Sequence, residues 1–226
     1  MTTYPIHECF HTWQGEGVHI GRPAFFIRTF GCPVKCPWCD SAGTWHPDFT
    51  PEVVGKHTAA DLAGMAVIRH AEIAVITGGE PTIYDLTELT RELKAKGLAT
   101  HLETSGAFEI LGEFDWITVS PKWQKLPLEV NVQEADEIKL IVEDESSIDR
   151  WWGKIKDYVR TSHVWLHPEW SQRSNSSLLS SISAAVKSGK GPFRAGYQLH
   201  KIYHVDGEDP GSQPPAPLGG NPKLGF

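Results

Sequence analysis

The feature that most limits how this chain can fold is a set of short apolar runs separated by helical segments. The run Ile73-Ala74-Val75-Ile76 is apolar at every position, which is typical of a strand covered on both faces in a parallel sheet. Runs rich in apolar, β-branched or aromatic residues are predicted as strands at residues 24–29, 72–77, 99–103, 116–119, 137–142, 163–166 and 194–199.

Amphipathic segments lie between these runs. Leu86, Leu89 and Leu93 recur at helical spacing, and Gly97 follows as a helix terminator. Further helices are predicted over residues 58–70, 145–159 and 176–187. The alternation predicts an α/β fold with a mostly parallel sheet, right-handed crossovers and a site at the carboxyl ends of the strands. It does not distinguish a barrel from an open sheet.

The composition of the chain excludes several classes of protein. A chain of 226 residues with 40% hydrophobic and 22% charged residues is expected to be globular, neither disordered nor fibrous. The net charge of −7 and the lack of a basic run argue against a nucleic-acid partner. The first residues do not resemble a signal peptide, and no apolar run approaches the length of a membrane span, so a cytoplasmic location without membrane contact is expected.

The most informative local feature is a group of three cysteines, Cys32, Cys36 and Cys39, directly after the first predicted strand. In a reducing compartment such thiols favour metal binding or catalysis over a disulfide, which would also leave a third thiol unpaired. Structural zinc needs four ligands, and Cys9 is distant in sequence. Three thiolates on one short loop match an iron–sulfur cube whose fourth iron remains open for a substrate or cofactor.

The C-x3-C-x2-C loop resembles that of the radical S-adenosylmethionine (SAM) superfamily, in which a 4Fe-4S cluster holds SAM at its unique iron. Thr77-Gly78-Gly79-Glu80-Pro81, directly after a predicted strand, is similar to the superfamily motif that contacts the SAM amino group. The resemblance implies the superfamily fold, a partial (β/α) barrel with mostly parallel strands and a shortened helical complement.

Further motifs resemble the 7-carboxy-7-deazaguanine synthase family over about residues 7–204. They are Thr12-Trp13-Gln14-Gly15-Glu16-Gly17, Gly21-Arg22-Pro23, Phe26-Ile27-Arg28, Cys39-Asp40-Ser41, Glu103-Thr104-Ser105-Gly106, Val119-Ser120-Pro121-Lys122 and Gln198-Leu199-His200-Lys201. That family converts 6-carboxy-5,6,7,8-tetrahydropterin to 7-carboxy-7-deazaguanine and ammonia, on the route to queuosine and related deazapurines. The implied enzyme is a radical SAM lyase in which SAM generates the radical and the protein positions it, without a catalytic side chain.

The resemblance also implies roles for individual residues. Substrate contacts are expected from Trp13, Gln14, Gly15, Glu16, Arg28, Thr77 and the terminal Phe226. SAM contacts are expected from Gly79, Glu80, Ser105, Ser120, Pro121, Lys122 and His167, which stands where the family has Gln. Cys32, Cys36 and Cys39 would ligate the cluster, and the Ser41 hydroxyl, in place of the family's Thr, would bind Mg²⁺.

The implied partners are the small pterin substrate, a flavodoxin or ferredoxin as electron donor, and a second copy in a homodimer. A glycyl-radical enzyme activase is the alternative enzyme, because it shares the short radical SAM core, but it acts on a protein and needs no Gln-Gly-Glu-Gly site. Residues 1–205 are expected to form the core domain. Residues 206–226, with five Pro and five Gly, are expected to form a tail without regular structure that packs on or near the active site.

Overall fold

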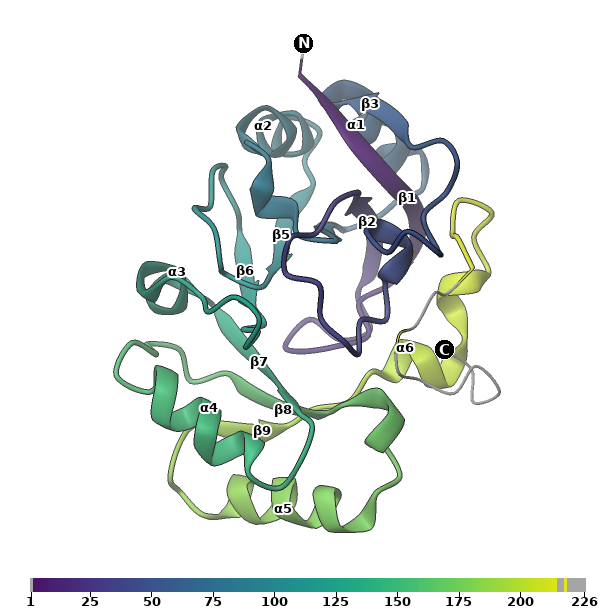
Figure 1. Ribbon diagram of the computed structural model, residues 1–226. Helices are drawn as coiled ribbons and strands as arrows, with labels where there is room; N and C mark the ends of the chain where they lie inside the picture. Colours follow the sequence, from purple (N-terminus) through teal and green to yellow (C-terminus); the bar gives the residue numbers. More distant parts are fainter. Residues whose placement is uncertain (1, 215–217, 219–226) are drawn as a thin grey trace.

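The computed structural model describes residues 2–214 and 218, and its described residues form a single curved sheet flanked by helices (Figure 1). The sheet has nine strands within this described part, in the order β3-β1-β2-β4-β5-β6-β7-β8-β9. The strands are β1 (Thr3–Trp13), β2 (Pro23–Thr29), β3 (Gly55–Thr58), β4 (Ile73–Gly78), β5 (Ala99–Thr104), β6 (Trp116–Val119), β7 (Glu137–Val142), β8 (Val164–Pro168) and β9 (Phe193–Ala195).

Every pairing from β2 to β9 is parallel, whereas β1 runs antiparallel to both β2 and β3. No ladder joins β3 to β9 in the described residues, so the sheet is an open, partial barrel. This confirms the expected fold class. The parallel register brings the carboxyl ends of β2, β4, β5 and β6 to one edge, where the predicted site residues follow.

The helices lie mainly on the outer face of the sheet (Figure 1). The α-helices are α1 (Ala59–Ile68), α2 (Thr87–Ala95), α3 (Glu129–Glu134), α4 (Ser147–Ile155), α5 (Ser176–Lys187) and α6 (Leu199–Tyr203). The 3-10 turns are η1 (Ala42–Thr44), η2 (Pro81–Ile83), η3 (Trp170–Gln172) and η4 (Val205–Gly207). Residues 105–115, which connect β5 to β6, contain no helix, in line with the expected shortened helical complement.

The central strand β4 is buried on both faces, as its unbroken apolar run predicts. Ala74 and Ile76 pack in the core beneath α1 and α2, while Ile73 and Val75 belong to a separate apolar cluster on the other face. A further core lies under α3, α4 and α5 and includes the fully buried side chain of Trp151. Because each face of the strand has its own apolar partners, β4 is fixed at the centre of the sheet.

Three predictions need correction. The run predicted as a strand at 194–199 is a strand only over Phe193–Ala195, and α6 begins at Leu199, whose N–H donates to the Gly15 carbonyl at 3.1 Å. Strands β1 and β3 and the short helices α3 and α6 were not predicted, because their side chains follow no clear period. The tail was expected to lack regular structure, but its first residues belong to η4.

No helix within the described residues has both the length and the apolarity needed to cross a membrane.

Candidate active site

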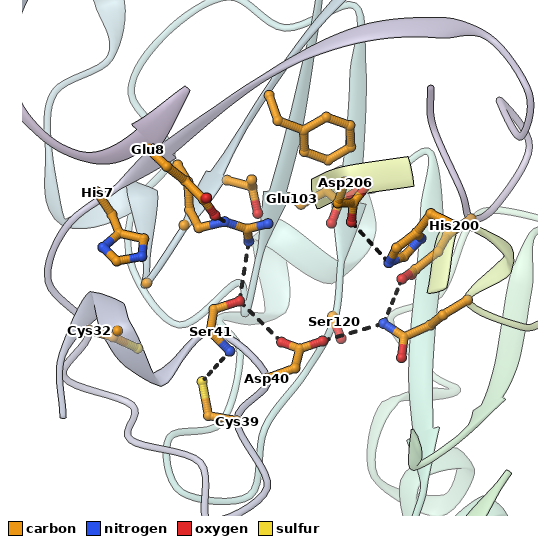
Figure 2. A pocket seen from close by; sticks show the side chains of 18 of the residues that line it. His7, Glu8, Cys32, Cys39, Asp40, Ser41, Glu103, Ser120, His200 and Asp206 are labelled. Atoms are coloured by element: carbon orange, nitrogen blue, oxygen red, sulfur yellow. Dashed lines mark hydrogen bonds and ion pairs between the residues drawn. The ribbon is translucent and has the colours of Figure 1, made fainter. Parts of the chain in front are cut away.

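The parallel strand ends and β1 enclose a cavity of about 710 Å³ (Figure 2). Its lining contains most of the residues expected from the sequence: Trp13, Gln14, Glu16, Arg28, Cys32, Cys36, Cys39, Ser41, Thr77, Gly79, Glu80, Ser105, Ser120 and Lys122. Gly15, Pro121 and His167 do not line it, and Phe226 lies outside the described residues. The cavity therefore brings together three groups that are far apart in the sequence: the cysteine loop, the Gly-Gly-Glu turn and the charged residues of the strands.

The three cysteines of the loop carry free thiols that face this common cavity. Burial raises the pKa of Cys36 to about 12 and that of Cys39 to about 11, so the thiols are protonated until a metal displaces the protons. The Cys39 Sγ accepts hydrogen bonds from the Ser41 N–H at 3.4 Å and from the Trp45 indole N–H at 3.5 Å. Such donors to sulfur are common around iron–sulfur clusters and adjust their potential.

The described residues contain no group of three His, Cys, Asp or Glu side chains that would converge on a single metal ion. In a 4Fe-4S cube each cysteine binds a different iron atom, and three cysteines leave the fourth iron open. The donor set of three cysteines on one loop therefore fits a 4Fe-4S cluster. Cys9 is separate: it packs against the core beneath α1 and α2, and burial raises its pKa to about 12.

The Gly78-Gly79-Glu80 turn at the end of β4 forms backbone hydrogen bonds with the end of β2 and with the cysteine loop, residues 31–39. The Gly79 N–H donates to the Thr29 carbonyl at 3.0 Å, and the Glu80 N–H donates to the Gly31 carbonyl at 2.9 Å. A Cβ at Gly79 would lie 2.2 Å from the Gly31 oxygen, and one at Gly78 would lie 2.3 Å from the Thr29 nitrogen. Only glycine allows this approach at both positions, which explains the Gly-Gly pair in the sequence.

Glu80 is almost completely buried, with 1% of its surface exposed. Its carboxylate accepts hydrogen bonds from the Thr82 hydroxyl at 2.7 Å, the Thr104 hydroxyl at 2.5 Å and the Ser105 N–H at 2.8 Å, and also from the Ser105 hydroxyl. These donors fix the orientation of the carboxylate and stabilise its charge. The Glu-Thr-Ser segment after β5 thus supports the Glu80 carboxylate as well as lining the cavity.

Lys122, which follows β6, also lines the cavity, and its ammonium group donates to the Ser120 carbonyl at 2.5 Å and to the Ser120 hydroxyl at 2.6 Å. Its Nζ is 5.6 Å from the ring centre of Trp38, which belongs to the cysteine loop. Burial lowers the pKa of Lys122, although the neighbouring Cys36 acts in the opposite direction. The side chain is therefore directed into the cavity and is not a solvated surface lysine.

Lys139 of β7 is a buried cation that lines the cavity. Its Nζ lies 2.6 Å from a Glu16 oxygen and 3.4 Å from a Glu103 oxygen. The other oxygen of each carboxylate accepts a side-chain amide hydrogen bond. Gln198 donates to Glu16 at 2.8 Å, and Gln14 donates to Glu103 at 2.9 Å. Each buried charge thus has an opposite charge and a hydrogen-bond donor or acceptor beside it.

The pKa values of the pair reflect this arrangement. Burial by itself would raise the pKa of Glu16, but the Lys139 ammonium outweighs it and holds that pKa well below its usual range. Burial would likewise lower the pKa of Lys139, but Glu103 and Glu16 raise it above its usual value. Both groups are therefore ionised at neutral pH.

Arg28 of β2 lines the cavity close to the end of the cysteine loop. Its Nε donates to a Glu8 oxygen at 2.6 Å, and its Nη1 donates to the Ser41 hydroxyl at 3.2 Å (Figure 2). The Ser41 hydroxyl in turn donates to Asp40 at 3.2 Å, and Asp40 also pairs with Lys201 at 2.9 Å. Ser41 thus stands between a guanidinium group and a carboxylate at the cavity surface.

His167 lies behind Glu16. It is 1% exposed, its Nδ1 is 4.0 Å from a Glu16 oxygen, and neither ring nitrogen has a hydrogen-bond partner in the described residues. Burial lowers the pKa of His167 to about 4, so the imidazole is neutral at neutral pH. Its contact with SAM stays a prediction.

Two functional candidates were missed in the sequence, Glu8 and Lys139. Lys139 interrupts the apolar strand Glu-Ile-Lys-Leu-Ile-Val, which is the same signal that identifies Arg28 on β2. Glu8 could not be identified in this way, because β1 carries several polar residues and was not predicted as a strand.

The first residues of the tail cross the open side of the cavity beside β1. Asp209 accepts a hydrogen bond from the His11 N–H at 3.2 Å and pairs with Arg69 at 3.2 Å. The Gln213 N–H donates to Glu8 at 2.6 Å, and the Leu218 N–H donates to the Cys39 carbonyl at 2.6 Å. This part of the chain therefore contacts both the Glu8–Arg28 pair and the cysteine loop.

Comparisons with known proteins identify the family of the chain. Residues 26–122 match the model of the radical SAM superfamily. The chain is 39% identical over 204 residues to a 7-carboxy-7-deazaguanine synthase of Synechocystis, covering 90% of this chain and 94% of that protein. It is 34% identical to the synthase of Flavobacterium psychrophilum, with 89% and 92% covered. The crystal structure of QueE from Escherichia coli matches with a TM-score of 0.72 at 33% identity, covering 88% of this chain and 95% of that one.

The Lys139 pair yields a prediction about stability and pH. Lys139→Met leaves the Glu16 carboxylate buried without its cation and should cost about 3–5 kcal/mol of unfolding free energy at neutral pH. In the parent chain the lowered pKa of Glu16 contributes stability that is present above about pH 4.3 and lost as the pH falls. In the variant, burial raises that pKa instead, so the deficit relative to the parent should shrink between about pH 7 and about pH 4.5 in urea unfolding.

Lys94→Met is the matched control, because the Lys94–Asp115 pair at 2.8 Å is partly exposed and should be worth less than about 1 kcal/mol. Adding Glu16→Gln to Lys139→Met should recover much of the loss. A deficit that is independent of pH, or equal to that of the control, would contradict the assignment of a buried ion pair.

Proposed function

The chain belongs to the 7-carboxy-7-deazaguanine synthase family of radical SAM enzymes, and from this premise we propose that it contracts the ring of 6-carboxy-5,6,7,8-tetrahydropterin with release of ammonia. The observation that carries the proposal is that one cavity is lined both by the three cysteines and by Gln14, Glu16 and Arg28. Residues suited to radical generation and residues suited to a polar small molecule thus share a cavity whose volume is typical of small-molecule sites. The relatives favour this function over a glycyl-radical activase.

The family implies a 4Fe-4S cluster and SAM, and Cys32, Cys36 and Cys39 would ligate the cluster. When bound, these groups supply a one-electron reduction that cleaves SAM and gives a carbon radical able to abstract hydrogen from C6 of the substrate. The residues assigned to SAM supply an acceptor for its ammonium group at Glu80 and polar groups at Ser105, Ser120 and Lys122. Because Gly79 has no side chain, the backbone there can approach a ligand closely.

The substrate residues offer complementary chemistry for a pterin carboxylate. Glu16 and the backbone of Trp13 can accept hydrogen bonds from amino and amide groups of the pterin edge, and Gln14 can both donate and accept. The Gly15 carbonyl already accepts the Leu199 N–H. Arg28 would bind the substrate carboxylate with its guanidinium group, exchanging part of its bonding with Ser41 for the ligand. Because Lys139 and Glu8 hold these side chains before substrate binds, little reorganisation is needed.

Mg²⁺ is the further cofactor of the proposal. The Ser41 hydroxyl would be its protein ligand, with Asp40 next to it as a hydrogen-bond acceptor for bound water. Mg²⁺ keeps several waters and few protein ligands, so a single hydroxyl together with a substrate carboxylate suits its preference. The role of the protein here is to hold the carboxylate end of the substrate between Ser41 and Arg28.

The proposed partners are a flavodoxin or ferredoxin as the electron donor and a second copy of the chain in a homodimer. The electron donor follows from the need for a one-electron reductant at the cluster. The tail is proposed to close the cavity over the substrate, either through residues 206–214 or through Phe226. The contacts of Asp209 and Gln213 with β1 and with Arg69, directly after α1, support the first of these roles.

The cluster assignment is tested by Cys36→Ala, which should abolish iron loading after anaerobic reconstitution and, with it, turnover of the carboxypterin with SAM and dithionite. Iron and sulfide analysis together with product absorbance are the measurements. Cys9→Ala is the matched control and should load iron like the parent, since Cys9 lies in the core outside the cavity. Full iron content in Cys36→Ala, or an equal loss in Cys9→Ala, would refute the assignment.

The Mg²⁺ assignment is tested at Ser41. Ser41→Ala removes the hydroxyl and should lower kcat/KM about tenfold or more while abolishing stimulation by added Mg²⁺. Ser41→Thr keeps the hydroxyl and should retain the stimulation. The measurement is activity as a function of Mg²⁺ concentration for the parent, Ser41→Ala and Ser41→Thr. The Mg²⁺ assignment fails if Ser41→Ala responds to Mg²⁺ as the parent does.

The tail is tested by two truncations. Removal of residues 206–226 should weaken substrate affinity about tenfold if the tail covers the bound pterin. Removal of residues 215–226 alone separates the two possible roles: it should leave the affinity unchanged if residues 206–214 form the cover, and weaken it if Phe226 does. Equal affinity in all three proteins, measured by equilibrium binding, would eliminate both roles.

A further inference from the structure

The segment that carries Gln14 and Glu16 is a closed loop, residues 14–22. At its base the Gln14 N–H donates to the Arg22 carbonyl at 2.9 Å, and the Gly21 N–H donates to the Gln14 carbonyl at 2.8 Å. Within the loop the Glu16 N–H donates to the Gln14 side-chain oxygen at 3.1 Å. These bonds hold the chain on the N-terminal side of Glu16 and leave its C-terminal side to other contacts.

Glu137, the first residue of β7, makes the nearest polar contact on that other side. One of its oxygens accepts the Val18 N–H at 3.0 Å and the Trp165 indole N–H at 3.0 Å. The other oxygen accepts the Thr118 hydroxyl at 2.9 Å. Since Thr118 belongs to β6 and Trp165 to β8, the buried Glu137 side chain joins the loop to three neighbouring strands.

Gly17 lies directly against this carboxyl group. Its φ of +69° is in the left-handed region, and a Cβ there would lie 2.3 Å from a Glu137 oxygen. A residue with a side chain would be strained in this conformation and would also push the loop away from β7. The glycine that follows Glu16 is therefore explained by the close approach of the loop to Glu137.

His19 gives the loop a further contact. Its ring centre lies 4.5 Å from that of His101 and 4.5 Å from that of Trp116. This packing is three residues away from Glu16, whereas the Val18 N–H is two residues away. The bond from Val18 is thus the contact that most directly limits where the Glu16 backbone can lie.

Glu137 and Lys139 are two residues apart on β7, so their side chains point to the same face of the sheet. Lys139 pairs with the Glu16 side chain at 2.6 Å, while Glu137 holds the backbone just beyond Glu16. Burying a second carboxyl group here costs solvation free energy, and an apolar residue would fill the same space without that cost. What the carboxyl group adds is a fixed acceptor for the loop.

We propose that Glu137 is a positioning residue of the substrate site: through Val18 it holds the Glu16 carboxylate in place and so sets the affinity for the pterin. The inference rests on the proposed function, in which Glu16 contacts the pterin edge. Glu137 is not among the residues that line the cavity, so its effect on the substrate has to pass through the loop.

The experiment measures kcat and KM for 6-carboxy-5,6,7,8-tetrahydropterin on the reconstituted holoenzyme with SAM and dithionite. Glu137→Leu should raise KM about tenfold and keep kcat within about threefold, because Glu16 contacts the substrate before and during the reaction alike. Glu137→Gln should keep both constants within about threefold, since its amide oxygen can accept from Val18 and its amide nitrogen can donate to the Thr118 hydroxyl. Iron content and SAM affinity should match the parent in both variants.

Thr118→Val is the matched control. It removes one hydrogen bond of Glu137 but leaves the bond to Val18, and Thr118 does not line the cavity. If Glu137 positions the loop, this variant keeps the KM of the parent. An unchanged KM in Glu137→Leu, an equal rise in Thr118→Val, or a rise in Glu137→Gln as large as that in Glu137→Leu would overturn the proposal.

A double-mutant cycle tests whether the effect passes through Glu16. Adding Glu137→Leu to Glu16→Gln should raise KM by less than about twofold further, because the carboxylate to be positioned is already missing. A further tenfold rise would contradict the proposal. If Glu137→Leu does not fold, Gly17→Ala displaces the same loop while β7 stays intact. Gly17→Ala should raise KM about as much, and the KM of the parent in that variant would contradict the proposal.

Hydrogen exchange of the Val18 amide is a measurement that does not depend on the reaction. Exchange should be at least about tenfold faster in Glu137→Leu than in the parent, and unchanged in Thr118→Val. If the parent neither binds nor converts the carboxypterin, the proposed function fails, while this measurement still decides whether Glu137 holds the loop. Equal exchange in the parent and Glu137→Leu would refute the positioning role whatever the outcome for the function.

Discussion

The arrangement of the whole site depends on the close backbone contact between the cysteine loop and the Gly-Gly-Glu turn. Two hydrogen bonds, from the N–H groups of Gly79 and Glu80 to carbonyls at the end of β2 and in the cysteine loop, join these segments. The parallel register of β2 with β4 sets Arg28 beside Thr77 at the same level. Because the contact leaves no space for a Cβ at Gly79, the cysteines and the residues assigned to SAM have one relative position.

The buried ion pairs of Lys139 with Glu16 and Glu103 are better explained by function than by stability. Lys139, Glu16 and Glu103 lose their hydration when they are buried, and well-packed apolar side chains would serve the fold at least as well. What the ion pairs supply is a fixed array of donors and acceptors before any ligand enters. In the proposed reaction, where one carbon atom of a small polar substrate has to be presented to a radical, such preorganisation offsets the lost solvation.

The parts of this structure that were predictable from sequence are those whose signals are local. The cysteine spacing, the Gly-Gly-Glu turn and the doubly buried β4 each lie within a few residues, and the helix over residues 176–187 has its N-cap, Asn175, directly before it. Strand β1 was not predictable, because its polar and apolar side chains follow no clear period. Helix α6 was missed because it starts where Leu199 bonds to Gly15, a contact between segments at opposite ends of the chain. The partners of Glu16 are equally distant: Lys139 is 123 residues away.

The first tail residues contact one part of the cavity lining and not another. The Gln213 N–H donates to Glu8, the partner of Arg28, and the Leu218 N–H donates to the Cys39 carbonyl. Lys122 is independent of these contacts, since its bonds to Ser120 involve neither the tail nor β1. A change in the position of the tail would therefore alter the surroundings of Arg28 and of the cysteine loop while leaving the Lys122–Ser120 contact in place.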